Sequence, residues 1–381
     1  MQQVLPILLT LVLTACGGGG GGSTPAATGA ATASRVAVLT LPNTNGFYTE
    51  AVGDLNGDGL DDIVISGWTM NSTTAYVYVF MQNADGTLTN RTSLLPNNIV
   101  AGSQRILLAD FDNDGHVDIF VPGFGETNAG MTNQNSVMFW GGTGNYTRTD
   151  WTDASMAHGA CTGDLNNDGK IDLLLAGSGV WINNGSRTFT KTNILTNNYF
   201  TACSVIKETA SNTVYLAQNN TVAGFRDAIA VYDFTLNLTG STGYQADASY
   251  DTIDVVAADL TGDGNRDFVL SLNGNAVNAA GPRQILAYTG ANTYAYSSTL
   301  DSKRSHYYAH KLTVGGTDAV LFSGDAGDAS IYVGTTKMYP SAFTTMSSSG
   351  TFANVYQNAT TGRLYMLQLI NLNTFYTQEI K

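Results

Sequence analysis

One nine-residue pattern occurs four times in the chain and constrains the fold more than any other feature. Aspartate stands at positions 1, 5 and 9, an oxygen-bearing side chain at position 3 and glycine at position 6. The four copies are Asp54–Asp62, Asp110–Asp118, Asp164–Asp172 and Asp259–Asp267. Oxygen ligands at these positions converge on one hard cation, and glycine permits the positive φ that turns the chain around it. The pattern therefore predicts four calcium loops.

The residues after each loop argue against the helix-flanked EF-hand. An EF-hand needs a glutamate at position 12 and a helix that leads out of the loop. Position 12 is Ile65, Val121, Leu175 and Leu270 in the four copies. Each stands in a short run of β-branched, aromatic or aliphatic residues, which is typical of a buried strand. The repeating unit is therefore strand, calcium loop, strand.

The spacing of the loops indicates how many units the chain contains. The first aspartates of successive loops are 56, 54 and 95 residues apart, so the last interval is a double step. It leaves room for a copy without ligands near residue 207, with strands over 202–206 and 213–217. Two further copies without ligands follow, over 311–322 and 352–367. Seven units of about fifty residues, each with roughly four short strands, predict an all-β, seven-bladed β-propeller.

The ends of the repeat region predict how the ring closes. The seventh unit stops at residues 376–381 with no fourth strand after it. Before the first unit stands the strand-like segment 35–41. We expect this N-terminal strand to complete the seventh blade and to remove a sheet edge that would otherwise invite aggregation.

At this point the chain resembles the FG-GAP or VCBS repeat family, whose calcium-loop blades also build the integrin α-subunit head. The resemblance covers about residues 35–381 and is carried by the four loops. It implies calcium bound by side chains at positions 1, 3, 5 and 9 and by the backbone carbonyl at position 7. These residues are Asp54, Asn56, Asp58, Leu60 and Asp62; Asp110, Asp112, Asp114, His116 and Asp118; Asp164, Asn166, Asp168, Lys170 and Asp172; and Asp259, Thr261, Asp263, Asn265 and Asp267. The hydroxyl of Thr261 departs from the pattern and predicts that the fourth site is the weakest.

The N-terminal segment predicts export. Its apolar run is too short to span a bilayer, so residues 1–15 are interpreted as a signal peptide. Leu13–Cys16 resembles a bacterial lipobox, which implies a lipid on Cys16 and an outer-membrane or cell-surface location in a bacterium. No Lys or Arg precedes the apolar run, which departs from the usual signal. Residues 16–34 are rich in Gly, Ala, Ser and Thr and should form a flexible tether, and 35–381 the propeller domain.

The charge of the chain is explained by its loops. The net charge is −13, and four Ca²⁺ ions bound to the 13 ligand carboxylates would reduce it to about −5. With 17 Lys plus Arg and no basic run, nucleic-acid binding is not expected. We expect a monomer that touches the membrane only through its lipid.

Two cysteines remain after Cys16. Aligning the units places Cys161 and Cys203 at the same depth on the innermost strands of neighbouring blades. An exported protein meets an oxidising compartment, so a disulfide is one reading. Buried thiols too far apart to bond are the other.

Function is less constrained by the sequence than the fold. No nucleophile elbow, phosphate loop or dinucleotide fingerprint stands in a suitable context. Aromatic residues among amide and hydroxyl side chains predict a face for a glycan or protein ligand: Tyr48, Trp68, Phe124, Tyr199, Tyr250 and Tyr307. The favoured hypothesis is a non-enzymatic binding or adhesion module. The alternative is a carbohydrate-active enzyme resembling a polysaccharide lyase, with Arg304, His306 and Tyr307 as its catalytic residues.

Overall fold

The computed structural model gives the structure of most of the repeat region. It describes residues 36–40, 46–69, 74–127, 130–152, 157, 159–192, 202–208, 213–218, 229–242, 250–274, 281–290, 293–303, 309–325, 330–338, 350–370 and 373–380. All of them belong to one compact unit, residues 33–381. Within these ranges no helix has the length and apolar character needed to cross a bilayer.

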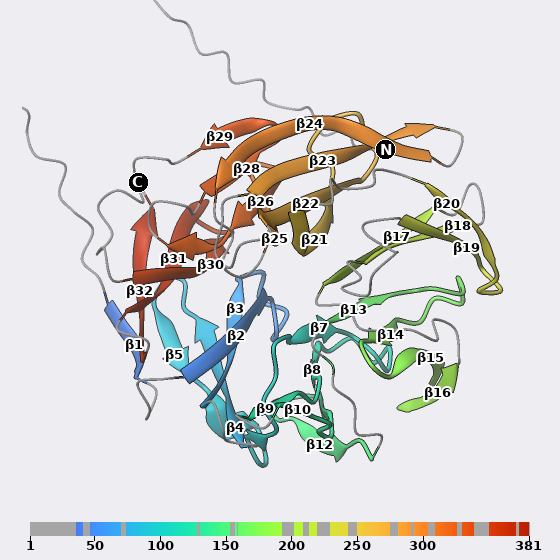
Figure 1. The fold of residues 1–381 in the computed structure, drawn as a ribbon. Helices are drawn as coiled ribbons and strands as arrows, with labels where there is room; N and C mark the ends of the chain where they lie inside the picture. Colours follow the sequence, from blue (N-terminus) through green and yellow to red (C-terminus); the bar gives the residue numbers. More distant parts are fainter. Residues whose placement is uncertain are drawn as a thin grey trace, which may run out of the picture. The chain divides into compact units, whose positions relative to one another are not determined.

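Seven antiparallel sheets of four or five strands follow one another around a central axis in chain order (Figure 1). The innermost strands contact each other in a closed ring, from β2 through β7, β13, β17, β21, β25 and β30 back to β2. The all-β, seven-bladed β-propeller predicted from the repeat spacing is thereby confirmed.

The first four blades contain the following strands. Blade 1 has β2 (Gly46–Gly53), β3 (Asp62–Thr69), β4 (Ala75–Gln82) and β5 (Leu88–Asn90), with β6 (Ile99–Val100) paired to β4; blade 2 has β7 (Leu107–Ala109), β8 (Asp118–Val121), β11 (Val137–Trp140) and β12 (Thr147–Asp150). Blade 3 has β13 (Ala160–Gly163), β14 (Asp172–Leu175), β15 (Gly179–Gly185) and β16 (Thr188–Thr192); blade 4 has β17 (Cys203–Glu208), β18 (Thr213–Gln218), β19 (Ile229–Asp233) and β20 (Leu238–Thr242). A separate ribbon pairs β9 (Gly125–Thr127) with β10 (Gly130–Thr132).

The remaining three blades close the ring. Blade 5 has β21 (Tyr250–Ala258), β22 (Asp267–Gly274), β23 (Gly281–Gly290) and β24 (Thr293–Lys303); blade 6 has β25 (Ala309–Val314), β26 (Thr317–Phe322), β28 (Ser330–Val333) and β29 (Thr336–Met338). Blade 7 has β30 (Gly350–Asn358), β31 (Arg363–Ile370), β32 (Thr374–Ile380) and β1 (Val36–Thr40), with β27 (Gly324–Asp325) paired to β30.

The continuous apolar runs of the second strands are explained by burial on both faces. In β3, Ile63 and Ile65 pack against blade 7, whereas Val64 packs against blade 2. In β8, Phe120 faces blade 3 while its two neighbours face blade 1. Each pair of adjacent blades shares one such hydrophobic cluster. The core of this propeller is thus a series of layers between blades, and each second strand contributes to two of them.

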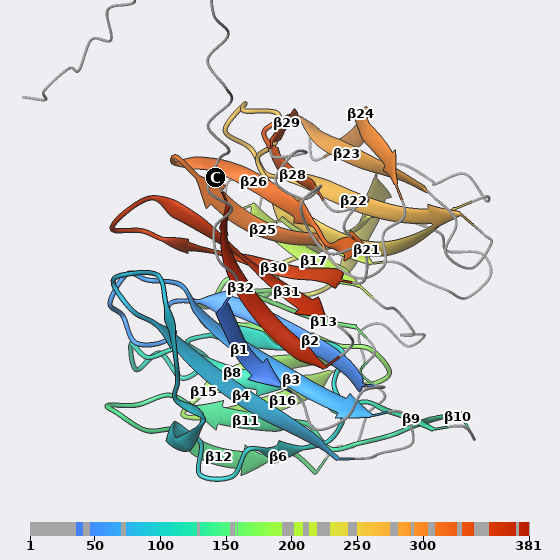
Figure 2. The same ribbon diagram turned by 90° about the vertical axis from the view of Figure 1, so that its left-hand side faces the viewer.

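Strand β1 lies at the outer edge of blade 7. It pairs antiparallel with β32, with Val36 opposite Thr377 and Thr40 opposite Thr374 (Figure 2). The order within this blade is β1, β32, β31, β30, so the outermost strand comes from the opposite end of the repeat region. Both ends of the ring therefore meet in a single sheet.

The outer strand of blade 1 is short. β5 ends at Asn90, and Thr92–Leu94 form a 3₁₀ turn. The side-chain oxygen of Asn90 accepts a hydrogen bond from the backbone N–H of Thr92 at 2.9 Å. This local bond offers the backbone an alternative to the sheet ladder and ends the strand.

Candidate metal loops and the inner ring

The four acidic loops join the first and second strands of blades 1, 2, 3 and 5. In the first loop the chain wraps around the carboxylate of Asp54, which accepts backbone N–H bonds from Asp58 at 3.2 Å and from Gly59 at 2.8 Å. The other three loops repeat the bond from the position 6 glycine, at 2.9–3.1 Å. These glycines have φ between 82° and 89°. A side chain with a Cβ rarely adopts this conformation, which explains the glycine.

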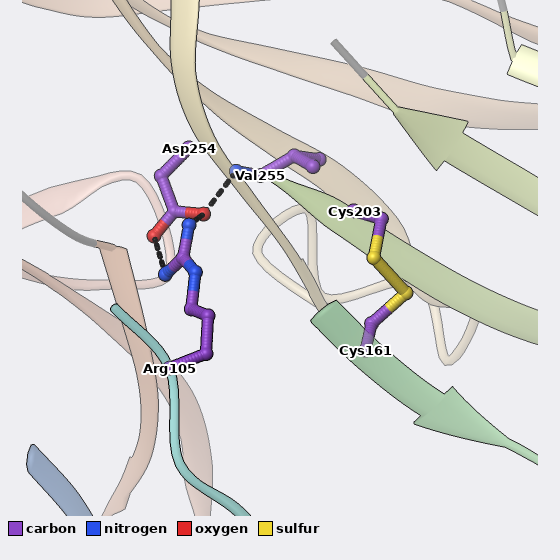
Figure 3. The surroundings of a disulfide bond; sticks show 5 residues. All are labelled: Arg105, Cys161, Cys203, Asp254 and Val255. Atoms are coloured by element: carbon purple, nitrogen blue, oxygen red, sulfur yellow. Dashed lines mark hydrogen bonds and ion pairs between the residues drawn. A yellow bond between two sulfur atoms is a disulfide. The ribbon is translucent and has the colours of Figure 1, made fainter. Parts of the chain in front are cut away.

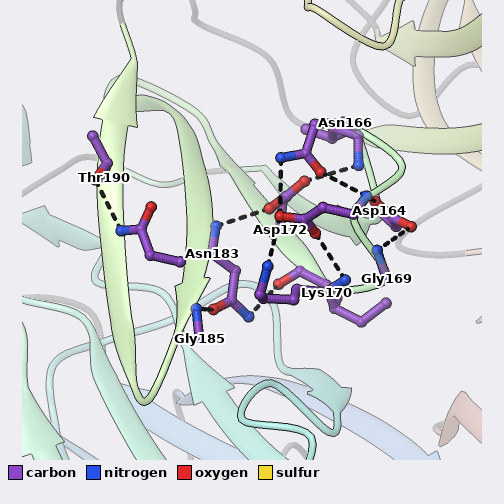
Figure 4. Close-up of polar contacts among 12 residues, drawn as sticks. Asp164, Asn166, Gly169, Lys170, Asp172, Asn183, Gly185 and Thr190 are labelled. Carbon is purple, nitrogen blue, oxygen red and sulfur yellow. Dashed lines mark hydrogen bonds and ion pairs between the residues drawn. The ribbon is translucent and has the colours of Figure 1, made fainter.

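The aspartate at position 9 is buried and joins its loop to the sheet. Asp62, Asp118, Asp172 and Asp267 are each 0 % exposed. One carboxylate oxygen accepts the backbone N–H of the position 2 residue at 2.7–3.0 Å in all four loops. In blades 1 to 3 the other oxygen accepts a backbone N–H from Gln82, Gly141 or Asn183, in or just after the third strand, at 2.7–2.8 Å. Figure 4 shows this bracing in the third loop.

Burial changes the acidity of these four carboxyl groups. Desolvation raises the pKa of Asp62 and Asp118 to about 7 and that of Asp172 to about 6, and it also raises the pKa of Asp267. Neighbouring carboxylates of the same loop raise the pKa further, while the backbone hydrogen bonds oppose the shift. A bound cation would reverse this balance, because it favours the ionised form.

The donor set fits a calcium ion. Side-chain oxygens of Asp110, Asp112 and Asp118 lie within 4.8 Å of one another, close enough to hold one metal ion. At positions 1, 3, 5 and 9 of the four loops, every side chain offers a carboxylate, amide or hydroxyl oxygen. Calcium prefers ligands of this type. The side chains at positions 1, 3, 5 and 9 would hold the ion. A bound ion would neutralise carboxylates that the fold has brought together.

Lysine and arginine side chains lie against two of the loops. In the third loop, Lys170 Nζ lies 2.8 Å from Asp168 Oδ2, and Lys207 Nζ lies 2.6 Å from Asp164 Oδ2. In the second loop, Arg187 Nε lies 2.6 Å from an oxygen of Asp112. Lys207 and Arg187 each come from the blade that follows their loop. Neither contact could be predicted from the spacing of the loop residues.

A second group of functional side chains surrounds the central axis. We call it the inner ring; each of the seven blades contributes one residue to it. A cavity of about 740 Å³ is lined by all seven members. They are, in blade order, Glu50, Arg105, Cys161, Cys203, Asp254, His310 and Asn354.

Two links of the inner ring are shown in Figure 3. The guanidinium of Arg105 donates to both carboxylate oxygens of Asp254, at 3.0 and 3.2 Å, and so connects blades 2 and 5 across the cavity. Asp254 also accepts the backbone N–H of Ala309 in blade 6 at 2.9 Å. Cys161 and Cys203 form a disulfide between blades 3 and 4, with their Cα atoms 5.7 Å apart.

The third link of the inner ring joins blades 1, 6 and 7. His310 Nε2 lies 3.4 Å from Glu50 Oε1, and His310 Nδ1 lies 3.3 Å from the amide nitrogen of Asn354. The side chain of Glu50 is 1 % exposed. Within the part of the chain that the structure describes, the inner ring therefore ties every blade to another, by a covalent bond or by a polar contact.

The aromatic residues predicted for a ligand face do not form one among the described side chains. Phe124 is 0 % exposed and belongs to the cluster between blades 1 and 2, so its prediction as a surface residue is wrong. The ring of Tyr48 packs edge-on against Phe375 of blade 7, with centroids 5.2 Å apart. Trp68 lies in β3 and Tyr250 in β21, but their side chains lie outside the described part of the structure.

Other predicted residues lie wholly outside the described ranges. They are Cys16, Tyr199, Arg304, His306 and Tyr307, together with the signal peptide and the tether.

The ring of seven antiparallel sheets defines the protein as a seven-bladed β-propeller. Residues 28–121 match the family described as FG-GAP-like repeat, and this segment contains the first two acidic loops. The match ends with β8, so it covers β1, blade 1 and the first two strands of blade 2. No curated protein matches the chain.

Three solved structures are similar over most of the chain. A protein of unknown function from Dyadobacter fermentans DSM 18053 is 11% identical, with 92% of this chain and 100% of that chain covered and a TM-score of 0.46. The biofilm matrix protein Bap1 of V. cholerae is 12% identical, with 91% and 68% covered and a TM-score of 0.36. The Dos1 propeller is 8% identical, with 91% and 95% covered and a TM-score of 0.43.

Proposed function

We propose that the chain is a calcium-stabilised propeller that is displayed on a lipid tether and binds a glycan or protein ligand, without catalysing a reaction. The observation that carries the calcium part is the shared construction of the four loops. In each, a wrapped carboxylate at position 1 and a buried carboxylate at position 9 belong to one turn. FG-GAP propellers are often surface or extracellular proteins, and this fold is consistent with an adhesion-type module.

The disulfide supports the proposed location. Cys161 and Cys203 are bonded, and disulfides persist in oxidising compartments such as the bacterial periplasm or the cell surface. A lipid on Cys16 would then hold the propeller at a membrane. Replacing Cys16 with serine should release the protein from the membrane fraction into the soluble fraction. If the Cys16→Ser variant stays with the membrane, the lipid anchor is wrong.

The calcium part is tested by thermal unfolding of metal-stripped protein with and without calcium. A ligand that binds only the folded state stabilises it by about 2.7 kcal/mol per site when present at 100 times its Kd. We therefore expect a clear rise of Tm in calcium, which EDTA reverses and magnesium does not reproduce. Identical melting curves in calcium and EDTA would contradict the proposal.

The ligand part is tested on a glycan array, probed in calcium and in EDTA. We expect retention of specific glycans in calcium and its loss in EDTA, because the scaffold then weakens. The same polysaccharides are incubated with the protein and monitored for the absorbance of unsaturated uronates. A signal that appears there and disappears in His306→Ala would overturn the non-enzymatic reading in favour of a lyase.

A further inference from the structure

The first and third loops form a matched pair within one chain. Both offer three carboxylates and one amide: Asp54, Asn56, Asp58 and Asp62 in the first, and Asp164, Asn166, Asp168 and Asp172 in the third. In both loops the backbone N–H groups at positions 5 and 6 donate to the position 1 carboxylate. The two loops therefore offer the same set of side-chain ligands, and they differ in Lys170 at position 7 of the third loop and in the residues that surround them.

The surroundings differ in charge. Two of the three carboxylates in the third loop are each paired with a lysine: Asp168 with Lys170 and Asp164 with Lys207. Among the residues that the structure describes, the three carboxylates of the first loop have no lysine or arginine within ion-pair distance. The affinity of a calcium site depends on the charge of its ligands. Two ammonium groups in contact with three carboxylates lower that charge from −3 to −1.

Lys207 is held in place by its blade. It lies in β17, the innermost strand of blade 4, which has no acidic loop of its own. Its ammonium also donates to Asn167 Oδ1 at 3.2 Å, so two residues of the third loop hold it. The side chain of Asp164 is 7 % exposed and that of Lys207 30 %, so the ion pair is partly shielded from the screening that weakens surface pairs.

From these contacts we infer that Lys207, assisted by Lys170, is a built-in cation that makes the third loop the weakest calcium site. It holds this loop to blade 4 when calcium is scarce. The inference rests on the proposed calcium binding and adds a ranking of the sites. It places the weakest site at the third loop rather than at Thr261, where the ligand chemistry alone had placed it.

The test is a calcium titration of the full-length, metal-stripped protein against a fluorescent calcium chelator. Lys207→Met keeps most of the side-chain volume and removes the charge, so one site should tighten by roughly ten-fold or more. Lys337→Met is the matched control, because Lys337 in blade 6 pairs with Asp301 in blade 5, which is not a residue of an acidic loop. This control should leave every site unchanged.

A second substitution assigns the site that changes. Adding Asp164→Asn to Lys207→Met should abolish the newly tightened site and leave the others as they were. If Lys207→Met does not fold, Lys207→Gln provides the same charge removal with a polar side chain.

The titration distinguishes a failure of the proposed calcium binding from a failure of the inference about Lys207. If the wild type binds no calcium, the proposed function and this inference both fail. If the wild type binds calcium and its isotherm is the same in the Lys207 variants, the calcium proposal stands and the inference alone is overturned.

Discussion

Asp118 illustrates how one residue can serve both the fold and a metal site. Its two carboxylate oxygens accept the backbone N–H groups of Phe111 and Gly141, at 2.7 Å each. Asp114 of the same loop is exposed and accepts one N–H, from His116. Both are candidate calcium ligands, but only Asp118 also completes buried hydrogen bonds.

We expect the two aspartates to respond differently to substitution. Asp118→Ala should lower the free energy of unfolding by about 2–4 kcal/mol even without calcium, because two N–H groups lose their acceptors in a buried setting. Asp114→Ala should cost little without calcium and remove only calcium-dependent stability. Chemical denaturation of each variant, metal-free and calcium-loaded, measures the loss of stability without calcium and the stability that calcium adds. Equal losses for the two variants in metal-free buffer would refute the distinction.

The buried loop carboxyls also predict a pH dependence. Without metal, the pKa values of Asp62 and Asp118 are about 7 in the folded state, against 3.8 for an ordinary aspartate. Between these values the folded state holds more protons than the unfolded state, so stability falls as the pH rises towards 7. Calcium keeps the carboxylates ionised and removes this loss. The gain in Tm on adding calcium should therefore grow from pH 5 to pH 8, and a constant gain over that range would contradict the pKa shifts.

The loop ligands could be predicted from the sequence, whereas the residues that contact the loops from another blade, and those of the inner ring, could not. The loop oxygens recur at fixed spacing, so their positions could be predicted. Lys207 and Arg187 reach a loop from the next blade and follow no such spacing. Glu50 and Asp254 lie within inner strands and belong to no repeated motif, and their partners lie far away in the sequence. Such pairs appear only once the ring is closed.

At the scale of strands, periodicity was enough to locate the blades. Apolar runs marked the second strands, because each is buried on both faces between two blades. The same logic does not extend to Phe124, which follows the end of β8 and which the aromatic pattern predicts as part of the ligand face. It is covered by the cluster between blades 1 and 2. Loop position alone does not show which aromatic rings the neighbouring blade will bury.

The pairing of β1 with β32 leads to a prediction for the whole domain. Deleting residues 35–41 would expose the edge of β32 along the register from Thr374 to Thr377. We expect a lower Tm in one cooperative transition and a greater tendency to aggregate, since an unpaired edge invites strand addition. Calorimetry and light scattering measure these effects. Replacing the exposed Val36 with threonine is the matched control and should change little. An unchanged Tm after the deletion would show that the strand is dispensable.

At the scale of the whole molecule, the inner ring links blades that are not neighbours. Arg105 and Asp254 join blades 2 and 5, and the side chain of Asp254 is 4 % exposed. Removing one partner of a buried pair leaves the other charge without compensation.

Arg105→Ala should therefore destabilise the propeller by about 3–5 kcal/mol, measured by chemical denaturation. Arg363→Ala is a suitable control, because the side chain of Arg363, which pairs with Glu379, is 57 % exposed. That control should change stability far less, since exposed pairs contribute about 0–1 kcal/mol. Similar losses in the two variants would argue against a special role for the pair in the inner ring.

The position of β1 also has a consequence for the order of events during biogenesis. This strand is synthesised before every other strand of the propeller, yet its partner β32 is the last of the described propeller strands in chain order. β1 cannot pair until β32 has been synthesised, so the ring cannot close before then. A chain truncated during synthesis or export would keep an open sheet edge that proteases and chaperones recognise. Closure at blade 7 therefore requires both β1 and β32, the two ends of the described propeller.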